Sequence, residues 1–250
     1  ASATTGLNHL DLDYLNSRGI EVLSLKGEVE FLSSITATAE HTWGLLLALI
    51  RNTLSSVEDV KKYNWDRSSF VGRELSGLTI GIMGYGRLGK IVAQYANAFR
   101  MRVLAYDPYE SSNSNSVTCV SRDYLLKNSD VVSLHLPLNS NTRQSFDRES
   151  FSIIKKGAFL INTSRGEIVN EEAMLEALRS GRVAGVGLDV LNDEVEWDTI
   201  PRNNRIVNEM QSSHNLIITP HIGGATVDSM HKTEVFIAKK ITEFLDRLEK

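Results

Sequence analysis

The 250-residue sequence contains a single cysteine, four prolines and no long apolar run. Cys119 has no second cysteine to pair with, so an internal disulfide is excluded, and the sequence fits a reducing compartment. The longest apolar run, residues 43–50, is far too short to cross a bilayer. No signal peptide is visible at the N-terminus. We therefore expect a cytoplasmic protein.

The sequence also lacks a strong excess of either charge, with 27 Lys and Arg against 31 Asp and Glu and a net charge of -4. No basic stripe occurs, so neither a nucleic acid nor an anionic membrane is expected as a partner. We expect no metal site. The spacing typical of metal ligands is not found between Cys119 and any of the histidines His9, His41, His135, His214 and His231. The composition, 42% hydrophobic and 23% charged, is typical of a globular protein.

Short hydrophobic runs alternate with helical patterns along most of the sequence. Six runs indicate buried strands, at residues 78–83, 103–106, 130–134, 158–162, 183–190 and 216–219. One intervening helix is bounded by Asn170 as its N-cap and by Gly181 after its end. Alternation of strands and helices with short connections predicts an α/β fold with a doubly wound parallel sheet.

Segments at the two ends depart from this alternation. Residues 20–25 are strand-like. Residues 36–51 form a helix that is apolar nearly all round, which is typical of burial within the protein or between subunits. Residues 227–248 place apolar side chains on one face of a long helix, and residues 111–116 predict a solvated loop. Both helices would expose large apolar patches on a monomer, which favours a homodimer.

A glycine-rich motif, Gly84-Tyr85-Gly86-Arg87-Leu88-Gly89, follows the first of the predicted strands and opens a helix. The first glycine permits a tight turn, the second lets the backbone approach a pyrophosphate, and the third lets helix and strand pack closely. The N-terminus of the helix offers free N–H groups and a positive dipole. This context favours a dinucleotide cofactor over a purely structural turn.

Asp107 ends the next predicted strand, 18 residues after Gly89 (107 minus 89). A carboxylate at this spacing accepts hydrogen bonds from the adenosine ribose hydroxyls and repels a 2′-phosphate. The residues that follow, Pro108-Tyr109-Glu110, are neutral to acidic. The pattern therefore favours NAD over NADP, although an aspartate before proline is also common in simple turns.

Three residues with useful chemistry, Arg165, Glu194 and His221, each follow a predicted strand. The guanidinium of Arg165 suits bidentate capture of a carboxylate. His221 can carry a proton, and Glu194 can hydrogen-bond the imidazole and raise its pKa. Considered one at a time, the three would be interpreted as a surface arginine, a loop carboxylate and a structural histidine. Because ligands bind outside the carboxyl ends of parallel strands, we expect the three to act together in hydride chemistry.

These motifs together resemble the D-isomer-specific 2-hydroxyacid dehydrogenases, with their phosphoglycerate, glyoxylate/hydroxypyruvate and D-lactate branches. The resemblance covers nearly the whole chain and extends to His135-Leu136-Pro137-Leu138, Asn162-Thr163-Ser164-Arg165-Gly166, Gly187-Leu188-Asp189-Val190 and Thr219-Pro220-His221-Ile222-Gly223-Gly224. It implies a Rossmann NAD-binding domain and hydride transfer between NAD and a small D-2-hydroxy acid or 2-oxo acid, with His221 moving the proton.

The resemblance also implies roles for individual residues. Arg165 is expected to bind the substrate carboxylate and polarise the keto group, with Glu194 orienting His221. Asp189 resembles the residue that hydrogen-bonds the nicotinamide amide, and Thr5 and Gly6 match the loop whose backbone N–H groups hold the substrate. Besides the glycine-rich motif, Asp107, Asp189, Arg165 and His221, cofactor contacts are implied for His135, Pro137, Thr142, Thr163, Ser164, Gly223 and Gly224.

The resemblance implies a division into domains. Residues 1–32 match a remnant of the substrate domain, residues 33–222 the NAD-binding domain, and residues 223–250 the helix that returns to the substrate domain. The family's first strands and helices would lie before Ala1, so we expect an incomplete substrate domain and poor turnover. The helix at residues 36–51 is similar to the family's dimer-forming helix, which predicts a homodimer through it.

Three alternatives remain at this point. The C-terminal-binding corepressors resemble the same family and keep the same three residues, so an NAD-binding protein without catalysis is one alternative. Formate dehydrogenases also resemble it, but they typically carry glutamine at the position of Glu194. A catalytically inactive, truncated paralogue is the third.

Overall fold

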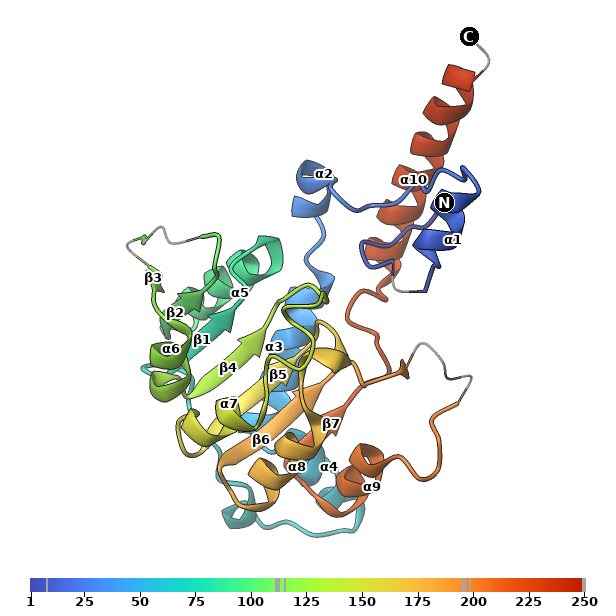
Figure 1. The fold of residues 1–250 in the computed structure, drawn as a ribbon. Coiled ribbons are helices and arrows are strands. Elements are labelled where there is room, and N and C mark those ends of the chain that lie inside the picture. Colours follow the sequence, from blue (N-terminus) through green and yellow to red (C-terminus); the bar gives the residue numbers. More distant parts are fainter. Residues whose placement is uncertain (8, 111–112, 115, 195–196, 198, 249–250) are drawn as a thin grey trace. The chain divides into compact units, whose positions relative to one another are not determined.

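The computed structural model describes residues 1–250 except 8, 111–112, 115, 195–196, 198 and 249–250 (Figure 1). The chain forms two compact units. Unit 1 comprises residues 1–37 and 224–250, and unit 2 comprises residues 38–223. Part of the solvated loop expected at residues 111–116 lies outside the described residues.

Unit 2 is built on a seven-stranded sheet in which every pairing is parallel and the strand order is β3-β2-β1-β4-β5-β6-β7. The strands are β1 (Thr79–Met83), β2 (Arg102–Tyr106), β3 (Thr118–Cys119), β4 (Val131–Leu134), β5 (Ala158–Asn162), β6 (Val183–Leu188) and β7 (Leu216–Ile218). The predicted α/β fold with a doubly wound parallel sheet is confirmed. The sequence patterns missed β3, because two residues are too few to show a pattern.

Helices cover both faces of this sheet (Figure 1). One face packs against α3 (Ala37–Ile50) and α5 (Arg87–Ala98), and the other against α6 (Arg122–Asn128), α7 (Arg148–Ile153), α8 (Glu171–Arg179) and α9 (Arg205–Ser212). The strands alternate between the two cores: Ile80 and Ile82 join the first, and Met83 joins the second. Residues buried on both sides explain why the strands appear in the sequence as continuous apolar runs.

Local signals set the ends of α8 as predicted. The Asn170 side chain accepts a hydrogen bond from the N–H of Ala173, which satisfies one of the first-turn donors of the helix. Gly181 has φ +68°, a left-handed conformation that ends helices and favours glycine. Unit 2 also contains α4 (Thr53–Lys61) and two short 3-10 helices, η1 (Ser68–Phe70) and η2 (Gly166–Ile168).

The apolar helix expected at residues 36–51 is α3, and its apolar side chains are buried within the subunit. The five large side chains Trp43, Leu45, Leu46, Leu49 and Ile50 are each 5% exposed or less. They pack on the sheet and α5, with the Trp43 ring stacked on Phe99 at 4.8 Å. The expectation that this helix leaves a large apolar patch on a monomer is therefore wrong.

Unit 1 consists of α1 (Leu12–Ser17), α2 (Val29–Ser33) and α10 (Val227–Leu248) with their connections. Its small core contains Leu25, Leu32, Ile35 and Ile237. The rings of Phe31 and Phe236 stack at 3.9 Å, and Lys240 forms an ion pair with Glu28. These contacts tie the N-terminal segment to α10.

The strand predicted at residues 20–25 is wrong. Two backbone hydrogen bonds join this segment to the N-terminus, from Ser2 N to Leu23 O at 2.8 Å and from Leu25 N to Thr4 O at 3.1 Å. They are too few to make a strand. The predicted long helix at residues 227–248 is confirmed, and much of its apolar stripe is exposed, including Val227 at 87% and Leu248 at 68%. In the described part of the chain, we find no helix that could span a membrane.

Candidate active site

The glycine-rich motif forms the turn between β1 and α5. Gly84 has φ +92°, and a Cβ there would lie 2.5 Å from the carbonyl oxygen of His135. A Cβ on Gly89 would lie 2.2 Å from the carbonyl oxygen of Gly84, so helix and turn touch through backbone atoms. Gly86 begins the helix and faces open space. The turn is therefore closely packed beneath and accessible above, where N–H groups of α5 can meet an anion.

The motif lies at the point where the strand order reverses. The chain proceeds outward from β1 through β2 to β3, and then returns to the other side of β1 with β4. Open α/β sheets form a crevice at this point, outside the carboxyl ends of the two central strands. Gly84 follows β1 and His135 follows β4, so both lie at the crevice. Its backbone lining suits a dinucleotide pyrophosphate.

Asp107 follows β2 and turns its carboxylate toward the glycine-rich turn. One oxygen, Oδ2, accepts a hydrogen bond from Tyr85 N at 2.9 Å, and Oδ1 accepts one from Tyr109 N at 2.9 Å. Each oxygen retains a further lone pair, because a carboxylate has about four acceptor positions. The carboxylate is thus fixed beside the turn, with capacity left for two ribose hydroxyls.

The loop after β4 contains His135, Pro137 and Thr142. Burial lowers the pKa of His135 to about 4, so the ring is neutral near pH 7, and its Nε2 lies 2.8 Å from the hydroxyl of Ser133. The Thr142 hydroxyl donates to the carbonyl of Pro137 at 2.5 Å and closes the loop. These contacts shape one wall of the crevice without placing a charge there.

The loop that carries Arg165 is held by Asn162, the last residue of β5. The Asn162 amide donates to Arg165 O at 2.9 Å, and its oxygen accepts from Ser164 N at 3.0 Å. The hydroxyl of Ser164 donates to Leu134 O on the neighbouring strand, and the Thr163 hydroxyl lies 2.8 Å from that of Thr42. Sequence reasoning assigned no role to Asn162, because its contacts are all local to a loop that only the structure defines.

The loop that carries Glu194 packs directly on the Arg165 loop. A Cβ on Gly166 would lie 2.1 Å from the carbonyl carbon of Leu191, so only glycine fits there. The N–H of Leu191 donates to Glu194 Oε2 at 3.0 Å, and that of Asn192 donates to Glu171 Oε1 at 2.9 Å. Backbone contact between the two loops therefore brings Arg165 and Glu194 to the same place.

Glu194 and His221 form a close pair, with 2.5 Å between Oε1 and Nδ1. The hydrogen bond to Glu194 raises the pKa of His221, while burial and the charge of Arg165 act in the opposite direction. The His221 side chain is 47% exposed and that of Glu194 only 19%. With Nδ1 engaged, Nε2 is the nitrogen left to exchange a proton with a ligand.

Asp189 follows β6 and holds the segment around His221. Its carboxylate, 1% exposed, accepts from the Thr219 hydroxyl at 2.6 Å and from the backbone N–H groups of Ile222 at 2.9 Å and Gly223 at 2.7 Å. Its own carbonyl accepts from His221 N at 2.9 Å. The imidazole of His41 in α3 also reaches this carboxylate, at 3.2 Å. Sequence reasoning missed His41 and Thr219, which no short-range pattern connects.

The remaining residues implied by the resemblance belong to unit 1. Thr5 is exposed, and the Thr4 hydroxyl donates to Gly6 O at 2.8 Å, which shapes the turn. Gly224 is the first residue of the returning part of that unit. Within unit 2, the structure brings together Arg165, Asp189, Glu194 and His221.

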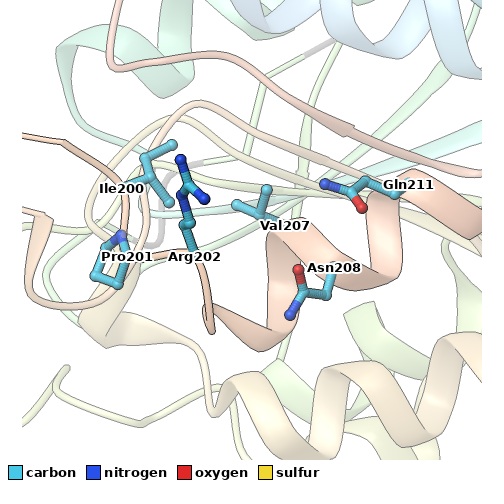
Figure 2. Close-up of a pocket in the computed structure, with 6 residues that line it drawn as sticks. All are labelled: Ile200, Pro201, Arg202, Val207, Asn208 and Gln211. Atoms are coloured by element: carbon cyan, nitrogen blue, oxygen red, sulfur yellow. The ribbon is translucent and has the colours of Figure 1, made fainter.

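A separate hollow of about 440 Å³ lies beside α9 and contains none of these residues. Figure 2 shows Val207, Asn208 and Gln211 on the helix and Ile200, Pro201 and Arg202 on the preceding segment. Among these six side chains only Arg202 is charged, and none is an acid–base group near pH 7. The hollow therefore offers no set of groups for proton or hydride transfer.

Comparison with known proteins agrees with the geometry. Residues 43–223 match the D-isomer specific 2-hydroxyacid dehydrogenase family in its NAD binding domain. A hydroxypyruvate reductase of Thermotoga maritima is 36% identical over 96% of this chain and 75% of its own length. A D-3-phosphoglycerate dehydrogenase of Bacillus subtilis is 34% identical over 97% of this chain, which spans only 44% of that protein.

Among solved structures, a D-lactate dehydrogenase from Aquifex aeolicus, complexed with NAD and lactic acid, superposes with a TM-score of 0.85 at 34% identity. The superposition covers 98% of this chain and 75% of the other. Sequence, fold and the position of the glycine-rich turn agree. The chain therefore belongs to the D-isomer-specific 2-hydroxyacid dehydrogenases, and residues 43–223 are their NAD-binding domain.

Proposed function

We propose that this protein interconverts a small 2-oxo acid and the corresponding D-2-hydroxy acid with NAD as cofactor. The observation that carries the proposal is the Glu194–His221 pair at 2.5 Å, with Arg165 on the loop that packs against the Glu194 loop. A proton donor and a carboxylate-binding cation at the cofactor edge of a Rossmann sheet are what reduction of a 2-oxo acid needs. The family membership and its NAD-binding domain support the same reaction.

The residues at the crevice fit the cofactor. Gly86 leaves room for the pyrophosphate above the tight turn made by Gly84 and Gly89, and Asp107 retains acceptor positions for the ribose. Asp189 Oδ2 receives one N–H, from Gly223, and retains a lone pair for the nicotinamide amide. When bound, NAD supplies the hydride chemistry, and the protein supplies orientation and charge.

Arg165, His221 and Glu194 each have a separate role toward the substrate. The Arg165 guanidinium would hold the substrate carboxylate in a two-point contact. His221, protonated because Glu194 raises its pKa, would donate from Nε2 to the carbonyl oxygen as C2 gains the hydride. In the reverse direction the neutral imidazole would accept the hydroxyl proton. Glu194 orients the ring through its contact with Nδ1.

The alternative function is NAD binding without turnover. The same three residues are compatible with it. Formate oxidation is less compatible, because formate presents no carbonyl oxygen that needs a proton and Glu194 would have no task. Oxidation of NADH on addition of hydroxypyruvate, glyoxylate or pyruvate separates catalysis from binding alone.

Arg165 and His221 should respond differently to substitution. His221→Ala should lower kcat roughly 10²–10⁴-fold with little change in NADH affinity, as loss of a general acid does. Arg165→Lys should raise KM for the oxo acid and also lower kcat, because a point charge cannot replace the planar fork. Steady-state kinetics and NADH fluorescence titration measure both. Equal and mild effects of the two changes would contradict the assignment.

The pH dependence of reduction should depend on Glu194. Reduction needs protonated His221, so its kcat/KM is full below the His221 pKa and falls as pH rises through it. Because Glu194 raises that pKa, Glu194→Gln should move the decline to lower pH. The reverse oxidation needs the neutral ring, and its rise should move in the same direction. Profiles that coincide with the wild type would show that Glu194 does not set the proton affinity.

Asp107 should set the choice of cofactor. Asp107→Ala removes the ribose acceptors and the repulsion of a 2′-phosphate, so the preference for NADH over NADPH should shrink by about 10–100-fold. The ratio of the two affinities is the quantity to measure, because the change also frees Tyr85 N from its partner. Glu110→Gln, which alters a neighbouring carboxylate paired with Lys90, is the matched control. An unchanged ratio in the Asp107 variant would show that Asp107 does not determine the choice between NADH and NADPH.

We also propose a homodimer through the region that begins with α3. Although α3 itself is buried, the segment after it is rich in exposed apolar side chains. These are Leu54, Val57 and Val60 of α4, each about half exposed, and Tyr63, Trp65 and Val71, at 99%, 91% and 79%. Apolar side chains gathered over one short segment are unusual on a monomer surface, and two-fold pairing covers them most simply.

The dimer can be tested by sedimentation velocity of the chain and two variants. Trp65→Ser together with Val57→Ser should shift a dimer to monomer, because the interface loses two apolar groups. Tyr109→Ser, which alters an equally exposed side chain at 94% in another part of unit 2, should leave the assembly unchanged. A wild-type chain that sediments as a monomer at micromolar concentration would end the proposal.

A further inference from the structure

His41 lies in α3, 178 residues before Thr219, yet its imidazole reaches the segment that carries His221. The Nε2 atom is 2.8 Å from the Thr219 hydroxyl oxygen and 3.2 Å from Asp189 Oδ1. The imidazole is only about one-fifth exposed. The imidazole is thus held at the carboxyl ends of β6 and β7.

The direction of the hydrogen bonds follows from the number of protons available. The Thr219 hydroxyl has one proton, and its shortest contact is to Asp189 Oδ1 at 2.6 Å. Its oxygen must therefore accept from His41, so His41 Nε2 carries a proton. The result is a continuous chain of donors, from His41 Nε2–H to the Thr219 hydroxyl and from that hydroxyl to Asp189. Hydrogen bonds in such a chain strengthen one another.

Asp189 connects this series of hydrogen bonds to the backbone of His221. Its buried carboxylate accepts from the N–H groups of Ile222 and Gly223, the two residues after His221. Its carbonyl accepts from the N–H of His221 itself. The contact leaves no spare room, since a Cβ on Gly223 would lie 2.8 Å from Asp189 Oδ2. One residue thus fixes three consecutive amides.

This anchoring matters because the backbone of His221 has φ +54°, in the left-handed region. A residue with a side chain keeps that conformation only when its surroundings impose it. Weakening the donors to a buried carboxylate leaves it undersatisfied, and the amides it holds become free to shift. The His221 ring would then lose its fixed direction, although His221 and Glu194 are both still present.

We propose that His41 is a positioning residue for His221 that acts through Thr219 and Asp189. The inference rests on the proposed function, in which His221 moves the proton. It assigns a reaction-related task to α3, a helix that otherwise serves the packing of the sheet. A purely structural role for His41 is the competing account.

The first test compares His41→Leu, His41→Gln and His214→Phe in the full chain, with hydroxypyruvate and NADH. His41→Leu should lower kcat about tenfold, the usual effect of one lost hydrogen bond to a charged network, with the NADH dissociation constant changed less than about threefold. Glutamine can still donate, so His41→Gln should recover most of the loss. His214, exposed in the same unit, is the matched control. An unchanged kcat in His41→Leu, or a loss that glutamine does not reduce, would overturn the proposal.

A double-mutant cycle tests whether the effect passes through Thr219. Thr219→Val removes the hydroxyl at similar size and should also lower kcat. In the Thr219→Val background His41 keeps only its longer contact with Asp189, at 3.2 Å, so His41→Leu should cost less there than in the wild type. Fully additive losses would mean that His41 acts by another route and would contradict the proposal.

Hydrogen exchange in the unliganded protein separates this inference from the proposed function. His41→Leu should speed exchange of the amides of His221, Ile222 and Gly223, with exchange of Gly84, bonded to Tyr106 O, unchanged as an internal reference. If the wild type turned over no 2-oxo acid but this local acceleration were seen, the proposed function would fail and the anchoring would stand. Uniform acceleration, or none at residues 221–223, would favour the purely structural role and refute the inference.

Discussion

All seven strands of unit 2 run in the same direction, so each delivers the residue that follows it to one edge of the sheet. That residue belongs to the candidate site in six of the seven strands: Gly84 after β1, Asp107 after β2, His135 after β4, Thr163 after β5, Asp189 after β6 and Thr219 after β7. The chemistry therefore depends first on the parallel hydrogen-bond ladder. It fixes where each strand stops relative to its neighbours, and the loops then add side chains at a common level.

Much of this arrangement could be predicted, because the strands are buried on both faces and stand out as apolar runs. The glycine-rich turn was predictable for a related reason, since Gly84 and Gly89 occupy positions where a Cβ would strike backbone. The errors came from segments whose structure depends on distant partners. Residues 20–25 have strand-like composition but, among the described residues, only two backbone hydrogen bonds to the segment at residues 1–6. The apolar side chains of α3 are covered by the sheet and α5.

The site was predictable to the extent that single side chains carry recognisable chemistry. Arg165, Glu194 and His221 could be singled out because each follows a strand and has a charge or a titratable ring. Their supporting residues could not. Gly166 matters only because the Leu191 backbone crosses it, and His41 meets its partners across 178 residues of sequence. Short-range sequence patterns cannot predict these contacts, because the loops and the helix come together only in the folded protein.

The left-handed backbone at His221 has a consequence for how such a sequence changes over time. Asp193, directly before Glu194, also has positive φ, at +59°, so both members of the acid–base pair lie in or beside strained loops. Glycine or asparagine at either position would relax the backbone and stabilise the fold, while at 221 it would remove the proton donor. Stability and turnover thus favour different residues at one position. A copy of this gene released from selection for catalysis would therefore be free to exchange His221 for a residue that suits the backbone better.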